Sequence, residues 1–242
     1  LPEAAERILF MKIHGLQKMT LLDFPGHVAC TVFLGGCDLR CPFCHNYDLA
    51  VGRAEPVMEE GELFSFLEKR KGLLDGVAFT GGEPCLRKEL PDIMRAVKEK
   101  GFKTKLDTNG CHPDMLGRIL EEDLADYVAM DIKNSPDKYA LTCGLEKMDL
   151  SPVYESISML KKGTCQYEFR TTAVREFHEE RDFHEIAGMI AGASSYFLQC
   201  FTDREEVFFD GFHAPSADEL RRYADIVSEY VKNVQLRGTE DA

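Results

Sequence analysis

The chain has 242 residues with a formal net charge of -13, and 29% of its residues are charged. This acidic balance, without a long basic run to offset it, argues against a nucleic-acid-binding protein. No apolar run of about eighteen or more residues occurs, so we expect no membrane-spanning helix and no membrane partner. Nine cysteines in a chain of this length, without a recognisable signal peptide, favour a reducing cytoplasm over a secreted disulfide framework.

Residues 1–10 precede Met11-Lys12-Ile13, which resembles a natural start of translation. We therefore expect residues 1–10 to be an extension outside the fold and residues 11–242 to form a single domain. The length is compatible with this expectation, because single α/β barrels of this size are common.

Short apolar stretches alternate along the chain with stretches whose apolar residues recur at helical spacing. The pattern predicts strands at residues 28–34, 77–80, 103–107, 127–132, 167–174, 196–201 and 234–236. It predicts helices at residues 59–71, 88–100, 114–122, 151–162, 181–191 and 216–231. Ser151 is the expected N-cap of helix 151–162, with Pro152 in the first turn, and Ser216 and Glu219 are expected to form a capping box.

Repeated strand–helix alternation indicates parallel strands joined by helical crossovers. A doubly wound sheet and an open β/α barrel both fit this pattern, and periodicity does not separate them. In both architectures the functional groups lie at the carboxyl ends of the strands. The residues that follow each predicted strand are therefore the first candidates for chemistry.

The loop after the first of these strands places Cys37, Cys41 and Cys44 at C-x-x-x-C-x-x-C spacing. Three thiolates so close in sequence can surround one soft metal centre, either zinc or an iron–sulfur cluster. Each iron of a [4Fe–4S] cluster takes one protein ligand, so three cysteines would leave one iron open to a substrate or cofactor. Zinc would need a fourth ligand, and the nearest candidate, His45, adjoins Cys44 and is poorly placed to reach the same ion.

Glycine or polar residues stand at the end of each later strand. They are Gly81, Gly82 and Glu83 after strand 77–80, Asp107 and Thr108 after strand 103–107, Asp131 and Lys133 around the end of strand 127–132, Arg170 in strand 167–174, and Gln199 in strand 196–201. Because the architecture brings strand ends together, we expect these side chains to converge on one ligand.

Most of these positions, but not Arg170, also have a purely structural interpretation. Gly-Gly-Glu could form a tight turn, Asp107 an Asx turn, and Asp131 with Lys133 a simple ion pair. Gln199 could make a satisfied hydrogen bond in the core. Arg170 is the exception, because a guanidinium inside an apolar strand is costly without an anionic partner.

The cysteine spacing, with an aromatic Phe43 before the third cysteine, resembles that of the radical S-adenosylmethionine enzymes. The stretches 15–26, 32–37 and 44–46 resemble the glycyl-radical-enzyme activases, and among these most of all the anaerobic ribonucleoside-triphosphate reductase activating proteins. The resemblance covers residues 11–238. It implies an α/β fold, a partial, open (β/α)6 barrel of parallel strands.

The resemblance also implies the cofactors, a [4Fe–4S] cluster held by the three cysteines and S-adenosylmethionine bound at its open iron. Carried over by motif, Gly81, Gly82 and Glu83 would face the amine of S-adenosylmethionine. Phe43 would flank the adenine, and Arg170 would reach the carboxylate or ribose side.

In pyruvate formate-lyase activating enzyme, the motifs that match Asp107-Thr108 and Asp131-x-Lys133 help to build a monovalent-cation site beside the cofactor. Oxygen ligands suit such an ion. The resemblance therefore implies a monovalent cation near Asp107 and Asp131 in this chain, although the intervening residues differ.

The function implied by the resemblance is reductive cleavage of S-adenosylmethionine and generation of a glycyl radical on a partner enzyme. The expected partner is the large subunit of anaerobic ribonucleotide reductase, and the expected reductant is a flavodoxin or ferredoxin. Alternatives are an activase of pyruvate formate-lyase or another glycyl radical enzyme, and a radical enzyme acting on a small molecule. A non-enzymatic iron–sulfur electron carrier or zinc-stapled binding module would leave the strand-end residues unexplained.

Overall fold

The computed structural model describes residues 11–163, 165–203 and 207–238. The expected extension at residues 1–10 lies outside them. The strands are β1 (Lys12–Ile13), β2 (Gly15–Thr20), β3 (Ala29–Leu34), β4 (Met58–Glu59), β5 (Gly76–Gly81), β6 (Lys103–Thr108), β7 (Tyr127–Asp131), β8 (Gln166–Ala173), β9 (Tyr196–Cys200) and β10 (Val234–Arg237). The helices are α1 (Tyr47–Ala50), α2 (Glu60–Glu68), α3 (Leu90–Glu99), α4 (Pro113–Glu121), α5 (Pro136–Thr142), α6 (Ser151–Lys161), α7 (Glu180–Met189) and α8 (Ala217–Ser228), with a 3-10 turn at Pro84–Leu86.

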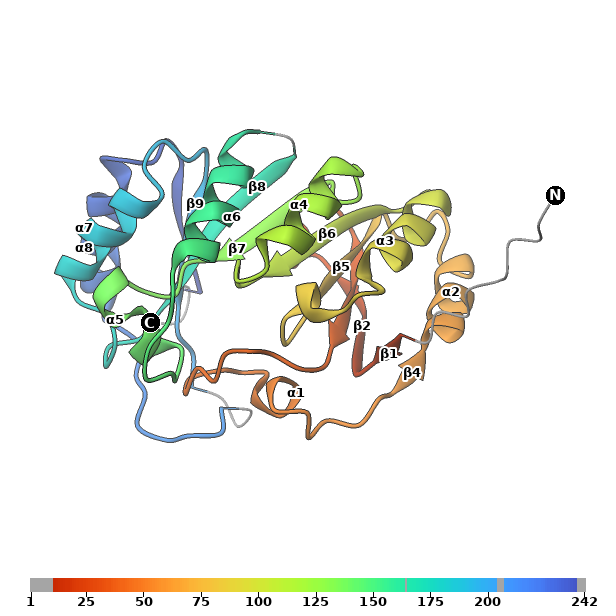
Figure 1. The fold of residues 1–242 in the computed structure, drawn as a ribbon, viewed down its shortest axis with the longest axis horizontal. Helices are drawn as coiled ribbons and strands as arrows, with labels where there is room; N and C mark the ends of the chain where they lie inside the picture. The colour runs from red at the N-terminus through yellow and green to blue at the C-terminus, as the bar shows by residue number, and fades with distance from the viewer. Residues whose placement is uncertain (1–10, 164, 204–206, 239–242) are drawn as a thin grey trace.

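An eight-stranded sheet in the order β10-β9-β8-β7-β6-β5-β3-β2 forms the centre of the molecule (Figure 1). All neighbouring strands are parallel except β2, which pairs antiparallel with β3. The two edge strands, β2 and β10, are not paired with each other, so the sheet is not closed. This arrangement confirms the predicted α/β fold with an open, partial barrel.

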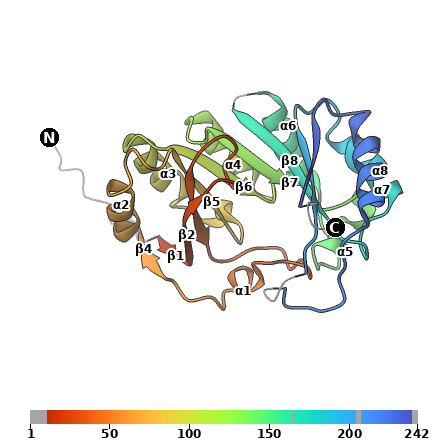
Figure 2. The same ribbon diagram turned by 180° about the vertical axis from the view of Figure 1, so that it is seen from behind.

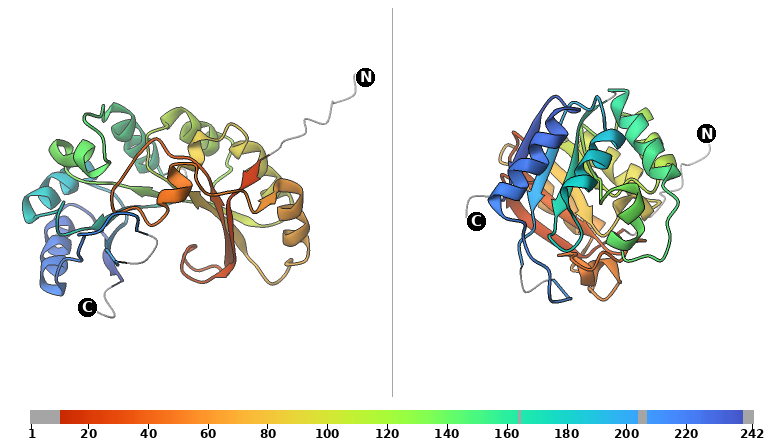
Figure 3. Two further views of the ribbon diagram at one scale, coloured as in Figure 1. Left: turned by 90° about the horizontal axis from the view of Figure 1, so that it is seen from below. Right: turned by 90° about the vertical axis from the view of Figure 1, so that its left-hand side faces the viewer.

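The sheet bends into an arc with most helices on its outer side (Figure 3, left). The short α1 lies apart from this layer, as Figure 2 shows from behind. The outer helices face the sheet with apolar residues such as Ile93 and Val97 of α3, which are fully buried. Burial of apolar surface on this scale is the main driving force for such a fold.

The predicted strands and long helices are present, with ends that differ from the prediction by up to three residues. The capping box of α8 is confirmed, because the Glu219 amide donates to the Ser216 hydroxyl and the Glu219 carboxylate accepts from the Ser216 amide. The prediction for Ser151 is wrong. It is the first residue of α6 rather than its cap, and its amide donates to the Asp149 carboxylate at 3.0 Å.

Five elements were not predicted: β1, β2, β4, α1 and α5. The antiparallel β2 carries no clear polar–apolar alternation, and its pairing with β3 shifts register between Gln17 and Thr20. The others have two to seven residues, too few for a periodic signal.

Candidate active site at the carboxyl ends of the strands

A cavity of about 290 Å³ opens at the carboxyl ends of the parallel strands. Every residue predicted for the site lies in its wall, except Glu83. These residues are Cys37, Cys41, Phe43, Cys44, Gly81, Gly82, Asp107, Thr108, Asp131, Lys133, Arg170 and Gln199. Convergence of the strand ends therefore brings together residues that lie far apart in the sequence.

The cysteine loop is folded back over the strand ends by main-chain hydrogen bonds. The amides of Gly36 and Cys37 donate to two carbonyl oxygens of α1, at 2.7 and 3.0 Å. Farther along the loop, the Arg40 amide donates to the Cys143 carbonyl at the end of α5, at 2.9 Å. The two short helices that the sequence did not reveal thus hold the loop from both sides.

Gly81 and Gly82 allow β5 to approach this loop closely. Gly81 has a φ of +124°, and a Cβ there would lie 2.3 Å from the Leu34 carbonyl oxygen. A Cβ on Gly82 would lie 2.1 Å from the Gly36 carbonyl oxygen. Both glycines are needed because main chain packs against main chain, in addition to any approach of a ligand.

The thiols are set among hydrogen-bond donors, which suits thiolate ligands. The Leu39 amide donates to Cys37 Sγ at 3.4 Å, and Asn109 Nδ2 lies 3.9 Å from the same sulfur. The pKa of Cys41 is lowered to about 7, because a hydrogen bond from Cys143 and the nearby Lys133 ammonium together outweigh its burial. Burial raises the pKa of Cys37 to about 12 and also raises that of Cys44, so Cys41 alone of the three thiols is shifted toward the thiolate.

The surroundings of the cysteine loop bear on the zinc site that its spacing also allowed. Among the described residues, no group of three or more His, Cys, Asp or Glu is placed to hold a single metal ion. His45, the candidate fourth zinc ligand, instead has its Nε2 2.8 Å from the Thr202 carbonyl oxygen. The three cysteines line one cavity, while the nearest candidate for a fourth zinc ligand is engaged elsewhere.

Glu83 does not face the cavity, contrary to the expectation that it would meet the amine of a ligand. Its side chain is buried, and its carboxylate accepts from the Cys85 amide at 2.9 Å, the Thr108 hydroxyl at 2.8 Å and the Asn109 amide at 2.7 Å. Burial raises the pKa of Glu83. The carboxylate joins the turn after β5 to the turn after β6 by hydrogen bonds. This agrees with the structural interpretation, in which Gly-Gly-Glu forms a tight turn.

Asp107, Asp131, Lys133 and Arg170 form a continuous network of charges in the cavity wall. Arg170 donates to Asp131 at 2.9 Å and to Asp107 at 3.3 Å, and Lys133 donates to Asp131 at 2.8 Å. Although burial raises it, the pKa of Asp131 is held below its usual range by Arg170 and then by Lys133. Arg170 thus has the anionic partners that its place in an apolar strand requires.

The network continues beneath the cavity, away from the ligand side. The Lys105 ammonium donates to Asp107 and lies 6.0 Å from the centre of the Tyr127 ring. The Tyr127 hydroxyl donates to Glu168 at 2.6 Å, and Arg237 of the last strand donates to both Glu168 oxygens at 2.7 and 2.9 Å. Polar groups below the cavity are therefore paired from β6 across to β10.

The expected monovalent cation does not fit this donor set. Both oxygens of Asp107 and both oxygens of Asp131 already accept a hydrogen bond from a cationic nitrogen of Lys105, Arg170 or Lys133. A further cation would have to share these oxygens with the ammonium and guanidinium donors, and would lie among three positive charges that repel it.

Phe43 belongs to a cluster of aromatic rings on one side of the cavity. Its ring centroid lies 5.5 Å from that of Phe177, 6.4 Å from that of Phe201 and 6.5 Å from that of Phe212. Only 6% of Phe43 is exposed. The cluster fixes the ring in the wall, where it presents an apolar face to the cavity.

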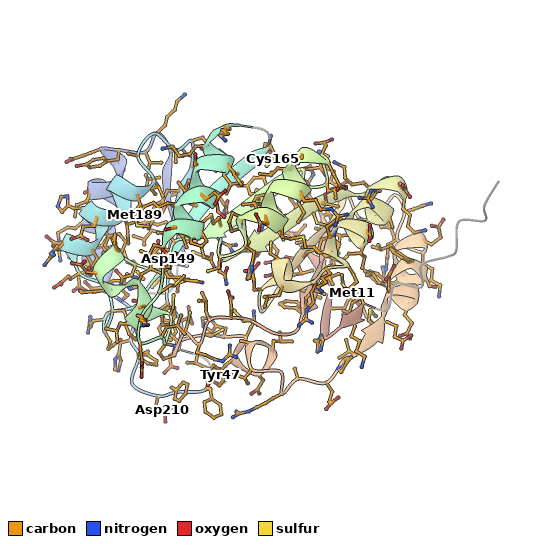
Figure 4. The ribbon with its side chains drawn as sticks, in the orientation of Figure 1. Met11, Tyr47, Asp149, Cys165, Met189 and Asp210 are labelled. Carbon is orange, nitrogen blue, oxygen red and sulfur yellow. The ribbon has the colours of Figure 1, made fainter. Side chains whose placement is uncertain are left out.

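A second group of rings lies at the rim. Tyr47 lines the cavity and stacks on Phe208 with centroids 5.0 Å apart, while Phe209 packs edge-on against Tyr47 at 5.2 Å. Figure 4 labels Tyr47 and the neighbouring Asp210 on the same lower side of the molecule. Phe208 and Phe209 are 52% and 42% exposed, so this rim offers apolar surface to solvent.

Sequence reasoning missed Lys105, Asn109 and Tyr47. Asn109 stands next to the predicted Asp107-Thr108 pair, and its Nδ2 donates to the Asp38 carboxylate of the cysteine loop at 2.9 Å. Its place at a strand end was a usable signal. Tyr47 and Lys105 gave none, because their roles depend on partners distant in the sequence.

Among the described residues, no helix has both the length and the apolar character needed to cross a membrane. The chain matches the family model of the Radical SAM superfamily over residues 31–187. It is 31% identical over 231 residues, 93% of this chain and 95% of the relative, to a Methanocaldococcus jannaschii protein provisionally named as a glycyl-radical enzyme activating enzyme. It is also 37% identical to the pyruvate formate-lyase-activating enzyme of Clostridium pasteurianum over 131 residues. This aligned region covers 52% of this chain and 54% of that enzyme.

Among solved structures, Streptococcus suis SuiB bound to S-adenosylmethionine matches 86% of this chain and 52% of its own, with a TM-score of 0.65 at 15% identity. At that identity the likeness concerns the fold alone. The family match covers the cysteine loop and most of the strand ends that form the cavity. The chain therefore belongs to the radical SAM superfamily, the enzymes that use a [4Fe–4S] cluster and S-adenosylmethionine.

Proposed function

We propose that this chain is an activase that generates a glycyl radical on the large subunit of anaerobic ribonucleotide reductase. The observation that carries the proposal is a cavity that combines three cysteines, a charged wall and an exposed aromatic rim. The near end-to-end similarity to an activating enzyme supports it. The exposed aromatic rings at the rim suit a segment of another protein better than a small metabolite.

In this proposal Cys37, Cys41 and Cys44 hold the cluster, and one iron remains free for S-adenosylmethionine. When bound and reduced, the cluster would supply the electron for reductive cleavage of S-adenosylmethionine, the chemistry by which a hydrogen atom would be removed from the partner's glycine. Lys133 and Arg170 present positive charge to the carboxylate of S-adenosylmethionine, because both line the cavity and remain ionised beside Asp131 and Asp107.

The remaining wall residues position the ligand and exclude water. Phe43 offers the apolar face for the adenine, while Gly81 and Gly82 contribute main chain without side chains. Thr108 and Gln199 supply polar groups at the ends of β6 and β9. No general acid–base pair is required, since the reaction moves a hydrogen atom rather than a proton.

We propose the ribonucleotide reductase as partner because the stretches 15–26, 32–37 and 44–46 resemble those of its activating proteins. Pyruvate formate-lyase is the second candidate, favoured by the 37% identity to its activating enzyme over about half of that relative. We further propose a flavodoxin or ferredoxin as the electron donor. All nine cysteines are free, which fits a reducing cytoplasm.

Electron paramagnetic resonance under anaerobic conditions tests the proposal. The reconstituted, reduced protein is mixed with S-adenosylmethionine and, in parallel samples, with each candidate partner. A glycyl doublet that requires all three components, and forms with the reductase subunit but not with pyruvate formate-lyase, is the expected result.

The two parts of the proposal fail differently in this experiment. A doublet only with pyruvate formate-lyase would replace the partner and keep the activase. Release of 5′-deoxyadenosine without a doublet on either protein would remove the activase and leave a radical enzyme with another substrate.

The aromatic rim gives a prediction that concerns the partner alone. Replacing Phe208 and Phe209 together with serine should reduce glycyl-radical yield by about tenfold, because exposed aromatic side chains contribute strongly to protein contacts. Cleavage of S-adenosylmethionine without partner should stay within about twofold of the wild-type rate, since neither ring is in the cavity wall. Equal loss in both assays would show that the rings support the cavity instead.

A further inference from the structure

Lys105 is a buried lysine that the proposed chemistry does not use. Its side chain is 2% exposed, although lysine is among the residues least often buried. It lies in β6 two residues before Asp107, so both side chains project from the same face of the strand. Its ammonium donates to Asp107, beneath the cavity rather than in its wall.

The ammonium of Lys105 completes the set of cationic hydrogen-bond donors around the carboxylates of Asp107 and Asp131. Asp107 Oδ1 accepts from Lys105, and Asp107 Oδ2 accepts from Arg170 at 3.3 Å. Asp131 Oδ1 accepts from Arg170 at 2.9 Å, and Asp131 Oδ2 accepts from Lys133 at 2.8 Å. All four carboxylate oxygens therefore face a cationic donor from the chain itself.

The surroundings of Lys105 favour a positive charge at this point. The ammonium lies 6.0 Å from the centre of the Tyr127 ring, within the range of a cation–π contact. Although burial raises it, the pKa of Asp107 is held below its usual range by Arg170 and then by Lys105. Asp107 is thus kept ionised by charges that belong to the fold.

We propose that Lys105 is a built-in cation that takes the place of a bound monovalent metal ion beside the cavity, so that this chain binds S-adenosylmethionine without sodium or potassium. Lys105 is a positioning residue, since it acts on the ligand through Asp107 and Arg170. It holds Asp107, Asp107 fixes the guanidinium of Arg170, and Arg170 presents its charge to the cavity. The inference rests on the proposed use of the cavity for S-adenosylmethionine.

The wild-type protein provides the first test. The full chain with its reconstituted cluster is titrated with S-adenosylmethionine by calorimetry, in potassium, sodium and tetramethylammonium buffers of equal ionic strength. We expect dissociation constants within about twofold of one another, because every oxygen of Asp107 and Asp131 already faces a cationic donor of the chain, whose charge would repel a metal ion. Tightening by about tenfold in potassium or sodium over tetramethylammonium would overturn the inference.

Substitution of Lys105 with methionine, which has similar length and no charge, should create the dependence that the wild type lacks. In tetramethylammonium the dissociation constant should rise about tenfold or more, because Asp107 loses one of its two cations and holds Arg170 less firmly. Potassium or ammonium ions should restore much of the affinity and raise the midpoint of thermal unfolding. An unchanged affinity in all buffers would overturn the inference.

Lys103→Met is the matched control, because Lys103 is in the same strand but exposed, with its ammonium 3.2 Å from His27. It should behave as the wild type in every buffer. If Lys105→Met does not fold, the wild-type titrations still decide the matter. Absence of binding by the wild type in every buffer would reject the proposed function itself, whereas metal-dependent binding would reject only the role of Lys105.

Discussion

Replacing Cys41 with alanine is expected to abolish cluster assembly and all cleavage of S-adenosylmethionine. Two cysteines cannot hold a [4Fe–4S] cluster that needs three protein ligands to leave a single iron open. Cys41 is buried, at 8% exposed, so removal of its sulfur should cost about 1 kcal/mol of stability through the small cavity it leaves, a minor effect beside the loss of iron. Iron content, visible absorption and 5′-deoxyadenosine release measure the effect.

Cys165→Ala is the matched control for this variant. Cys165 directly precedes β8, at the end of the sheet away from the cavity, and is labelled at the upper edge of Figure 4. It should retain full iron and full activity. A Cys41→Ala protein with a complete, active cluster would contradict the assignment, and the additional change Cys143→Ala would then test whether the neighbouring thiol had replaced the ligand.

Replacing Glu83 with alanine should destabilise the fold rather than remove a ligand contact. Its carboxylate is the acceptor for three buried donors, on Cys85, Thr108 and Asn109. Each donor left without a partner costs about 1–3 kcal/mol, so we expect the free energy of unfolding to fall by about 3 kcal/mol or more. Urea denaturation gives this value, and calorimetry on the folded fraction gives the affinity for S-adenosylmethionine.

Glu83→Gln distinguishes the structural role from direct contact with the ligand's amine. Glutamine keeps one acceptor oxygen but loses the charge, so stability should fall by less than in the alanine variant while affinity stays close to that of the wild type. Full stability with an affinity reduced about tenfold would mean that the charge of Glu83 reaches the ligand after all.

The sequence predicted the parts of this molecule that depend on local patterns. Buried strands such as β3 and β7 are short apolar runs, and amphipathic helices such as α3 have clear periodicity, so their places could be predicted. The edge strand β2 and the short α1 and α5 are formed mainly through contacts with the rest of the fold, including those that hold the cysteine loop. Such elements are not visible in local periodicity.

The same distinction applies to the cavity. Residues at strand ends could be predicted, because the architecture of parallel sheets dictates where those ends meet. The direction in which a single carboxylate points could not be predicted. For this reason the sequence placed Glu83 beside the ligand, whereas in the structure its carboxylate joins two turns. A lysine in a strand suggests an exposed position, and only the pairing of Lys105 with Asp107 under the Tyr127 ring reveals its burial.

The ion pair between Arg237 and Glu168 has a consequence for the order in which the protein is made. Glu168 is fully buried under the cavity, and Arg237, from the last strand of the sheet, donates to both oxygens of its carboxylate, in addition to the hydrogen bond from Tyr127. Cys37 is synthesised two hundred residues before Arg237, so the cysteines are made long before Glu168 can pair with Arg237. The buried carboxylate of Glu168 therefore gains its cationic partner only after β10 has been translated, so this part of the sheet can be completed only at the end of synthesis.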